Sequence, residues 1–433
     1  MATQTRTPHQ LSERPKKAAL VKEFLDKPLN ALRTPAMVID RTLFAENCAS
    51  MHSRAKTWGA SFRAHLKTHK TVEGTRLQLQ STNDRTQAVV VSTLMEAWEV
   101  VNAGLVSDQI VKDILYGFPV PLNKIADLSD LWDEVSKYDG TIRLLVDHPE
   151  QVKFLEQFES SREKPRRWSV FVKVDGGQRR AGVSPDSPLF RELLSLLFSS
   201  PATSVYGFYV HAGNSYAAKS PSQASSFLSA EVEAVNTAAE AALAALNASS
   251  GKEYHQQPFV LSVGATPTAH AASAETRRML SSMLHGVLEL HAGNYPLLDL
   301  QQRHTGMIDE GRIAQRVLAT VVSYYPGRGE AGEDEALIDA GAIAFSKDTG
   351  PSGGYGDVIG MNWRIGRMAQ EHGILTRIDR GASDEKLEVG SLVEIVGQHA
   401  CLIAAAYPWY YIVDKNVEQG TKVVDIWVPW KGW

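Results

Sequence analysis

Apolar residues of this chain fall into short runs that are separated by polar turns and by longer amphipathic stretches. Nine of the runs have the length and residue types of β-strands. They occupy residues 36–40, 61–67, 87–92, 110–115, 142–147, 169–175, 204–210, 259–264 and 287–290. Between most of them, apolar positions recur at helical spacing, for example at residues 94–103, 150–158, 189–198 and 224–246.

Repetition of strand and helix on this scale predicts a parallel sheet with helices outside it. We therefore expect an α/β fold, and a (β/α)8 barrel of the TIM type is the commonest closed form. Nine runs are one more than such a barrel needs. We expect the first run, residues 36–40, to pair outside the barrel with strands from the C-terminal part of the chain.

Helical spacing becomes scarce after about residue 312, which indicates a second, β-rich domain. The strands expected there occupy residues 317–324, 335–345, 391–396, 401–406 and 409–414. The chain is thus expected to have three parts. They are an N-terminal extension at residues 1–33, a cofactor-binding barrel at 34–311 and a β-rich domain at 312–433.

The composition excludes several classes of protein. Of the 433 residues, 43% are hydrophobic and 22% are charged, which is typical of a globular protein with a sizeable core. A formal net charge of −4 gives no reason to expect nucleic acid or a membrane as a partner. The two cysteines, Cys48 and Cys401, are too few for a disulfide scaffold. Because the N-terminus is polar and no apolar run is long enough to span a bilayer, we expect a cytoplasmic protein.

Lys67, at the end of the run 61–67, is the first candidate for chemistry. On a strand, Arg63, His65 and Lys67 would lie on one side, and Lys67 would reach the face where barrels place their active sites. An amine there can bind an aldehyde cofactor such as pyridoxal phosphate covalently and then transfer a proton. The alternative is a surface lysine in a basic turn, with His65 and His69 packed beside it.

Two other strand ends carry polar groups that could face the same site. Asp175 begins a glycine-containing turn from which Arg180 could reach the barrel mouth, and a surface ion pair is an equal alternative. Tyr209 and His211 share one side of their strand, with ordinary barrel packing as the alternative.

The loops after the last two barrel strands contain small residues that let the main chain approach an anion. These loops are residues 264–268 and 291–295. Barrels often bind phosphate in these loops, so their place in the strand order predicts a phosphate site.

His399 and Cys401 form a candidate metal pair. They are two positions apart, so on a strand both side chains would point to the same side. An imidazole and a thiolate favour zinc over magnesium or calcium. The alternative is a core cysteine beside a hydrogen-bonded histidine, because two residues do not complete a tetrahedral site. Cys48 lies in a helical stretch and is expected to be core.

The residues from Arg63 to Lys70, with the sequence RAHLKTHK, resemble a known motif. It is similar to the Arg-Pro-His-x-Lys-Thr-His-Lys motif of fold-type III pyridoxal-phosphate enzymes, the group that contains alanine racemase, with Ala64 in place of proline. Within this group the chain most resembles the eukaryotic, zinc-dependent D-serine dehydratase family, from residue 34 to its end. The motif implies that Lys67 is the lysine that binds the cofactor. A second match, at Asp175, Gly177, Arg180 and Gly182, implies that Arg180 lies beside the phenolic oxygen of the cofactor.

The resemblance also implies the remaining site residues. The other implied contacts of pyridoxal 5'-phosphate are Tyr209, Tyr216, Thr266, Gly293 and Asn294, and the implied zinc ligands are His399 and Cys401. Gly397 and Gln398 stand where the family often has Pro-Asn, which is a departure beside the metal histidine.

The activity implied by the resemblance is β-elimination of the D-amino acid D-serine to pyruvate and ammonia, by a homodimer. D-threonine aldolase is an alternative that uses a carboxylate where this chain has Cys401, and D-threo-3-hydroxyaspartate dehydratase is a further one. A non-catalytic pyridoxal-phosphate carrier would lack the second domain, and a racemase would lack the metal pair.

Overall fold

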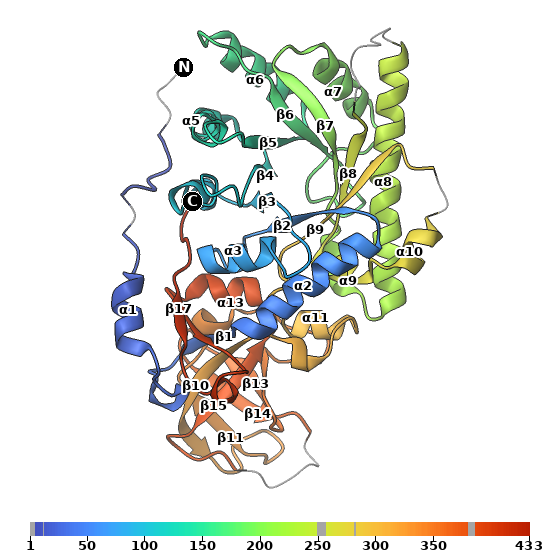
Figure 1. Ribbon diagram of the computed structural model, residues 1–433. Helices are drawn as coiled ribbons and strands as arrows, with labels where there is room; N and C mark the ends of the chain where they lie inside the picture. The colour runs from blue at the N-terminus through green and yellow to red at the C-terminus, as the bar shows by residue number, and fades with distance from the viewer. Residues whose placement is uncertain (1–4, 12, 249–256, 281–282, 380–385) are drawn as a thin grey trace.

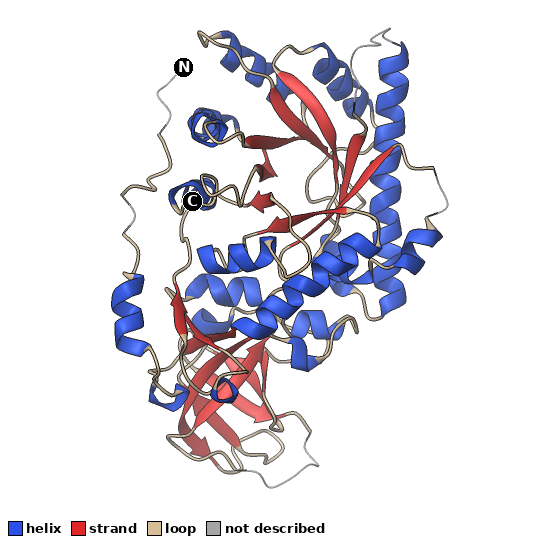
Figure 2. Cartoon of the chain, viewed as in Figure 1, coloured by secondary structure: helices blue, strands red, loops and turns tan. Residues whose placement is uncertain are grey.

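The structure, a computed structural model, describes residues 5–11, 13–248, 257–280, 283–379 and 386–433. It contains a closed parallel barrel and a second, nine-stranded sheet, which occupy the upper and lower parts of Figures 1 and 2. The predicted fold class, an α/β barrel of the TIM type joined to a β-rich part, is therefore confirmed.

The barrel has eight parallel strands and closes where β9 pairs with β2. These strands are β2 (Ser61–His65), β3 (Ala88–Val91), β4 (Asp113–Pro119), β5 (Thr141–Val146), β6 (Trp168–Lys173), β7 (Thr203–Tyr209), β8 (Phe259–Val263) and β9 (Gly286–Ala292). Helices lie outside the barrel, as the blue and red elements of Figure 2 show. The carboxyl ends of the strands meet at one face of the barrel, which is where parallel barrels place their functional groups.

Several helices of the barrel part begin at residues whose side chains accept hydrogen bonds from free N–H groups of the first turn. Asp40 caps α2, since its Oδ1 accepts from the main-chain N–H groups of Thr42 and Leu43 at 2.9 and 3.1 Å. The α-helices are α2 (Arg41–Thr57), α3 (Val72–Leu79), α4 (Leu94–Asn102), α5 (Ile125–Ser136), α6 (Pro149–Ser160), α7 (Pro188–Ser199), α8 (Pro221–Ala248), α9 (Thr266–Ala271), α10 (Ala274–Met279) and α11 (Leu300–His304). Short 3-10 helices are η2 (Leu122–Lys124), η3 (Gly213–Ala217) and η4 (Glu310–Arg312).

The second sheet has the strand order β11-β14-β13-β12-β15-β10-β1-β16-β17. Its strands are β1 (Ala36–Asp40), β10 (Gln315–Tyr325), β11 (Glu335–Ile338), β12 (Gly356–Val358), β13 (Trp363–Met368), β14 (Gly373–Arg377), β15 (Leu392–Gly397), β16 (Tyr410–Val413) and β17 (Asp425–Trp427). The remaining helices are α1 (Lys17–Phe24), α12 (Ala342–Phe345), α13 (Ala400–Ala406), η1 (Leu29–Ala31) and η5 (Glu418–Gly420).

Strand β1 lies in the second sheet and not in the barrel. It pairs antiparallel with β10 and parallel with β16, so the chain begins in one sheet before it forms the other. All five residues of β1 are buried, which accounts for its continuous apolar run. The prediction that the first of the nine runs pairs outside the barrel with C-terminal strands is confirmed.

Three predicted strands differ from the structure. The strand expected at 110–115 begins three residues later, as β4. Residues 335–345 do not form one strand, because β11 ends at Ile338 and a helical turn, α12, follows. Residues 401–406 form most of helix α13 and not a strand. A short, wholly apolar run shows no period, so its sequence does not distinguish a strand from a buried helix.

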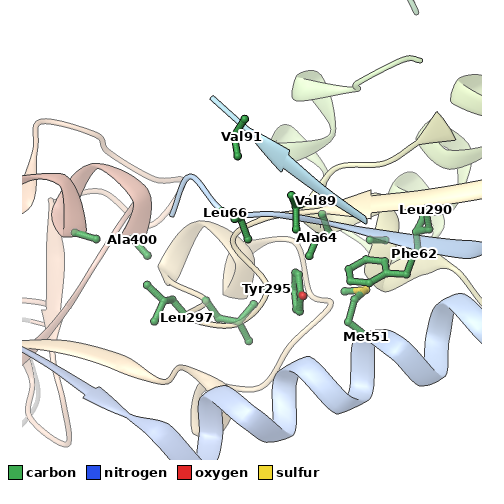
Figure 3. Packing of buried hydrophobic residues seen from close by; sticks show 14 of the residues in the cluster. Met51, Phe62, Ala64, Leu66, Val89, Val91, Leu290, Tyr295, Leu297 and Ala400 are labelled. Atoms are coloured by element: carbon green, nitrogen blue, oxygen red, sulfur yellow. The ribbon is translucent and has the colours of Figure 1, made fainter. Parts of the chain in front are cut away.

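One continuous hydrophobic core extends from the barrel to the base of the second sheet. Figure 3 shows Phe62, Ala64 and Leu66 of the β2 segment packed with Met51 of α2 on one side. On the other side the same cluster reaches Ala400, the first residue of α13. The lysine-bearing segment after β2 and helix α13 thus share packing. Among the helices of the described residues, none has both the length and the apolar character that a membrane span requires.

Gly207 of β7 lies very close to the main chain of β8 in the barrel wall. A Cβ atom at Gly207 would lie 2.0 Å from the main-chain oxygen of Val260. We expect Gly207→Ala to lower the free energy of unfolding by about 2–4 kcal/mol, because main chain and not a flexible side chain must move. Chemical denaturation measures this. In the control Gly311→Ala, the added Cβ meets no atom within 4 Å, and we expect a change below about 0.5 kcal/mol.

Candidate functional site

Lys67 lies in the turn that follows β2, two residues beyond the end of the strand. Leu66 continues the barrel pairing, since its N–H donates to the carbonyl of Val90 at 3.0 Å. The N–H of Lys67 donates to Nδ1 of His65 at 3.3 Å. Burial and then the charge of Lys67 hold the pKa of His65 well below its ordinary value, so His65 is neutral and can accept this bond. The sequence thus placed Lys67 at the correct edge of the barrel, although β2 ends before it.

A buried ion network lies in the barrel below Lys67. Arg63, which is fully buried, donates to Oε1 of Glu289 at 2.9 Å and to both oxygens of Asp113 at 2.7 and 3.2 Å. Arg143 also donates to Asp113, at 2.7 Å. Burial lowers the pKa of Arg63, but the charges of Asp113 and Glu289 outweigh burial and raise it, so the guanidinium stays charged. The motif arginine therefore supports the barrel from inside.

This network extends to Tyr209 through two further side chains. Ser262 donates to Glu289 at 2.8 Å, so its oxygen accepts from Nδ1 of His291 at 3.0 Å. The ring of His291 stacks on that of Tyr209, with centroids 4.1 Å apart and planes 8° apart. His211 also lies beside His291, with ring centroids 6.3 Å apart. Tyr209 and His211 thus contact one common neighbour, as expected if they share a side.

Arg180 lies on the turn that Asp175 closes. Oδ1 of Asp175 accepts from the N–H groups of Gly177 and Arg179, both at 3.0 Å. The charge of Arg180, second to burial, lowers the pKa of Lys173 to about 8. Lys173 is 5% exposed and lies at the carboxyl end of β6, so Arg180 is near the barrel mouth.

The loops after β8 and β9 meet each other close to His65. The N–H of Asn294 donates to Oγ1 of Thr266 at 3.1 Å, and Tyr216 hydrogen-bonds to the same threonine. A Cβ atom at Gly293 would lie only 3.1 Å from Cβ of His65, so glycine permits this close approach. The five residues Thr266, Gly293, Asn294, Tyr216 and His65 form one contact group.

His399 and Cys401 lie at the start of helix α13. The strand expected for them is wrong: His399 is the N-cap residue, and its carbonyl accepts from Leu402 and Ile403. The two side chains nevertheless converge, because they are hydrogen-bonded to each other across the first turn. Sγ of Cys401 lies 3.1 Å from Oγ1 of Thr68, which directly follows Lys67. This contact joins the predicted metal pair to the lysine.

Two carboxylates orient the His399–Cys401 pair. Nδ1 of His399 lies 2.8 Å from Oδ2 of Asp348, which directs Nε2 away from that carboxylate. Asp299, fully buried, accepts from the N–H of Ala400 at 2.8 Å and from Nδ2 of Asn294 at 2.6 Å. Asp299 therefore connects the loop after β9 to the start of helix α13, where His399 and Cys401 lie.

The pair is electrostatically coupled. Burial raises the pKa of the Cys401 thiol, but the hydrogen bond and charge of His399, with Lys67 and Thr68, outweigh burial and lower it. Burial lowers the pKa of His399, whereas Cys401, Asp299 and Asp348 raise it above its ordinary value. The arrangement thus favours a thiolate, the form in which cysteine binds metals.

Gln398 stands where the family that this chain resembles often has asparagine. It is 1% exposed, its carbonyl accepts from the N–H of Gln301 at 3.1 Å, and its Nε2 donates to the carbonyl of Gly354 at 3.3 Å. Gln398 is thus held through its main-chain carbonyl and its side-chain amide, and Asp348 bonds directly to His399.

Several site residues were not found from the sequence. Asp299, Asp348 and Glu231 are single acidic residues in a loop or helix, and only the fold brings them to the site. His65 and His291 flank predicted residues, so their place in the same short segments was a usable signal. Lys173 lies two residues before Asp175, at the end of β6, and carried the same kind of signal. The neighbours to which the sequence assigned no individual role are Thr68, His65, Lys173, Glu231, His291, Asp299 and Asp348.

Both parts of the chain match known families. Residues 39–281 match the family described as alanine racemase, N-terminal domain, and residues 314–413 match the putative serine dehydratase domain. D-serine dehydratase of Schizosaccharomyces pombe is 43% identical over 96% of both chains. D-serine dehydratase of Saccharomyces cerevisiae is 33% identical over 93% of this chain and 96% of its own.

The fold is also similar to solved structures. D-threo-3-hydroxyaspartate dehydratase from Delftia sp. HT23 is 29% identical, with a TM-score of 0.77 over 94% of this chain and 100% of its own. Two further structures are of single-residue variants of a D-threo-3-hydroxyaspartate dehydratase. One has a histidine replaced by alanine, and the other has the cysteine two positions later replaced by alanine. The cysteine variant is in a metal-free form. These matches define a barrel protein of the alanine racemase type with an added dehydratase domain. The chain belongs to the D-serine dehydratase family.

Glu231 of α8 holds two loops of the site and supplies a test. Its Oε1 accepts from the N–H groups of Ala212 and Gly264 at 2.8 and 3.2 Å. Burial raises its pKa from 4.5 to about 7, despite these donors. A carboxyl group whose pKa is higher in the folded than in the unfolded chain stabilises the fold when the pH lies below the pKa of the unfolded chain. This contribution is lost as the pH rises through about 7.

We therefore expect Glu231→Gln, which does not titrate, to gain stability relative to the wild type between pH 5 and pH 8. The shift corresponds to a gain of about 2–3 kcal/mol. Urea denaturation at both pH values measures the difference. The control Glu233→Gln, an exposed position of the same helix, should show the same difference at both pH values. A pH-independent difference for Glu231→Gln would contradict the assigned titration.

Proposed function

We propose that this chain is a lyase that converts D-serine to pyruvate and ammonia by β-elimination, with pyridoxal 5'-phosphate and zinc as cofactors. Membership of the D-serine dehydratase family supports the reaction, and the alanine racemase-type barrel supports the pyridoxal phosphate. The single observation that carries the proposal is the 3.1 Å contact between Thr68 and Cys401, which places the lysine turn against the thiol–imidazole pair. Elimination of a hydroxyl group needs both an amine base and a means to stabilise the leaving oxygen.

Lys67 is proposed to bind the cofactor aldehyde and, once the substrate amine has replaced it, to remove the proton from the α-carbon. When bound, pyridoxal phosphate supplies the ring system that delocalises the negative charge left on that carbon. Arg180 is proposed to lie beside the phenolic oxygen and Tyr209 beside the ring. Tyr209 already has a fixed orientation, since it stacks on His291.

The phosphate is assigned to the loops after β7, β8 and β9. Tyr216, Thr266, Gly293 and Asn294 form one contact group there, in which the main chain at Gly293 lies close to His65. Oδ1 of Asn294 is buried without a partner, so this loop has a polar group still to be satisfied.

The donor set of His399 and Cys401 fits zinc. A thiol with a lowered pKa and an imidazole whose other nitrogen is held by a carboxylate are the usual features of a zinc site. Within the described residues, no group of three or more His, Cys, Asp and Glu side chains could hold a metal ion. We therefore infer a catalytic ion with two protein ligands, whose other positions are open to water and substrate. When bound, zinc supplies a Lewis acid for the departing hydroxyl group.

We also propose that the protein is a cytoplasmic homodimer. Both cysteines are free, which agrees with a reducing compartment. Light scattering of the purified, cofactor-loaded protein tests the dimer, and a monomeric mass would contradict it.

The reaction is tested by supplying D-serine, D-threonine and D-threo-3-hydroxyaspartate separately, each with and without a chelator. We expect D-serine to give pyruvate and ammonia, and chelation to abolish this turnover until zinc is restored. Faster formation of oxaloacetate from D-threo-3-hydroxyaspartate would assign the chain to the second dehydratase, which is 29% identical to it. Glycine plus an aldehyde would indicate aldol cleavage instead.

The zinc assignment is tested by Asp348→Asn and Cys401→Ser. Asp348→Asn keeps the shape of the side chain but weakens its hold on His399, so we expect zinc affinity to fall about 10- to 100-fold. Cys401→Ser should lose zinc almost completely. Cys48→Ala is the matched control, because Cys48 is the other cysteine and lies buried in α2 away from the pair. Metal analysis after dialysis measures all three. Full zinc content in Cys401→Ser would refute the assignment.

A further inference from the structure

The C-terminal segment leaves the second sheet and docks beside the proposed active site. After β17 it runs past α13 toward the barrel, as the red trace that ends at C in Figure 1 shows. Trp430 in this segment is fully buried, in the same hydrophobic cluster as Leu66, Ala400 and Ile403. The segment thus belongs to the same hydrophobic core as the lysine turn and helix α13.

Two sets of hydrogen bonds attach the segment to the two halves of the site. The N–H of Trp430 donates to the carbonyl of Lys70 at 2.7 Å. Nζ of Lys431 donates to the carbonyls of Ala404 and Ala405, at 2.8 and 2.6 Å. Lys70 lies three residues after Lys67, and Ala404 lies three residues after Cys401.

The two hydrogen bonds of Lys431 are made to carbonyls in the last turn of helix α13. The last carbonyls of any helix lack partners within the helix, and a cation there also interacts favourably with the helix dipole. Helix α13 has only seven residues, so its own hydrogen bonds stabilise it little. Tyr410 donates to Ala404 as well, at 3.1 Å, but it carries no charge. Lys431 is thus the cation that closes the end of this short helix.

We propose that Trp430 and Lys431 form a C-terminal clamp that sets the position of Cys401 relative to Lys67. Lys431 is a positioning residue in this clamp: it acts on the thiol through the end of α13 and does not touch the substrate. The clamp's role in catalysis rests on the proposed function above. Its effect on the position and mobility of Cys401 does not depend on that function.

The chain offers a direct readout of that mobility. It has two cysteines, of which Cys48 is 0% exposed whereas Cys401 is partly accessible. A thiol reagent added to the folded, zinc-free protein therefore reports on Cys401 before Cys48 reacts. Release of zinc to a chelator from the loaded protein gives a second, independent readout.

The test compares Lys431→Met with the wild type. Methionine keeps the unbranched, apolar stem of the side chain but removes the charge and the donors, so the end of α13 should open more often. We expect the rate of thiol modification and the rate of zinc release each to rise about fivefold. Release of pyridoxal phosphate should not change, because the main-chain bond from Trp430 to Lys70 is kept. A general loss of stability would raise the rates of thiol modification, zinc release and pyridoxal phosphate release together. A change in the first two rates alone therefore indicates a positioning role.

Two further variants serve as controls. Lys431→Arg keeps the cation and should return both rates to within twofold of the wild type. Lys422→Met removes a lysine whose partner is Glu418, on the surface of the same C-terminal part, and should leave the rates unchanged. Equal rates in Lys431→Met and Lys422→Met would overturn the clamp.

If Lys431→Met does not fold, Lys431→Gln with hydrogen exchange in the α13 peptide decides instead. Faster exchange confined to this peptide supports the clamp, and exchange equal to the wild type overturns it. None of these readouts requires turnover. A wild-type protein without activity on D-serine would therefore refute the proposed function while the clamp is still tested.

Discussion

The buried carboxylate of Asp299 is the interaction on which the site depends. It accepts from Nδ2 of Asn294, from the N–H of Ala400 and from the N–H of Gln302, at 2.6, 2.8 and 2.9 Å. Burial raises its pKa, so only such donors make a carboxylate acceptable at this depth. One donor comes from the loop after β9 and another from the start of α13. This single carboxylate therefore links the barrel to the helix that follows β15 of the second sheet.

The two halves of the site carry different chemistry because their surroundings differ. Within the barrel Arg63 lies among carboxylates, while burial lowers the pKa of His65 and of His291 and keeps both rings neutral. Beside it, His399 and Cys401 polarise each other toward imidazolium and thiolate. The lysine turn and the His399–Cys401 pair are thereby held at one junction in different electrostatic surroundings. The fold thus separates in space two functions that the proposed elimination needs together.

The sequence predicted the barrel well because period and order are local signals. It also predicted that residues 36–40 leave the barrel, since the count of strands exceeded eight and the C-terminal part offered partners. It failed at residues 401–406, where a short apolar run has no period that separates helix from strand. Asp299 and Asp348 were missed for another reason. Their roles arise from contacts with residues about 50 to 100 positions away, Asp348 with His399 and Asp299 with Ala400, and no local pattern encodes such contacts.

The most direct test of the account is to identify the lysine that binds the cofactor. The purified chain is loaded with pyridoxal phosphate, reduced with borohydride, digested and analysed by mass spectrometry. Three amines lie near the barrel mouth, those of Lys67, Lys70 and Lys173, so the position of the label is informative. We expect the reduced cofactor on Lys67 alone. A label on Lys70 or Lys173, or no label at all, would contradict it.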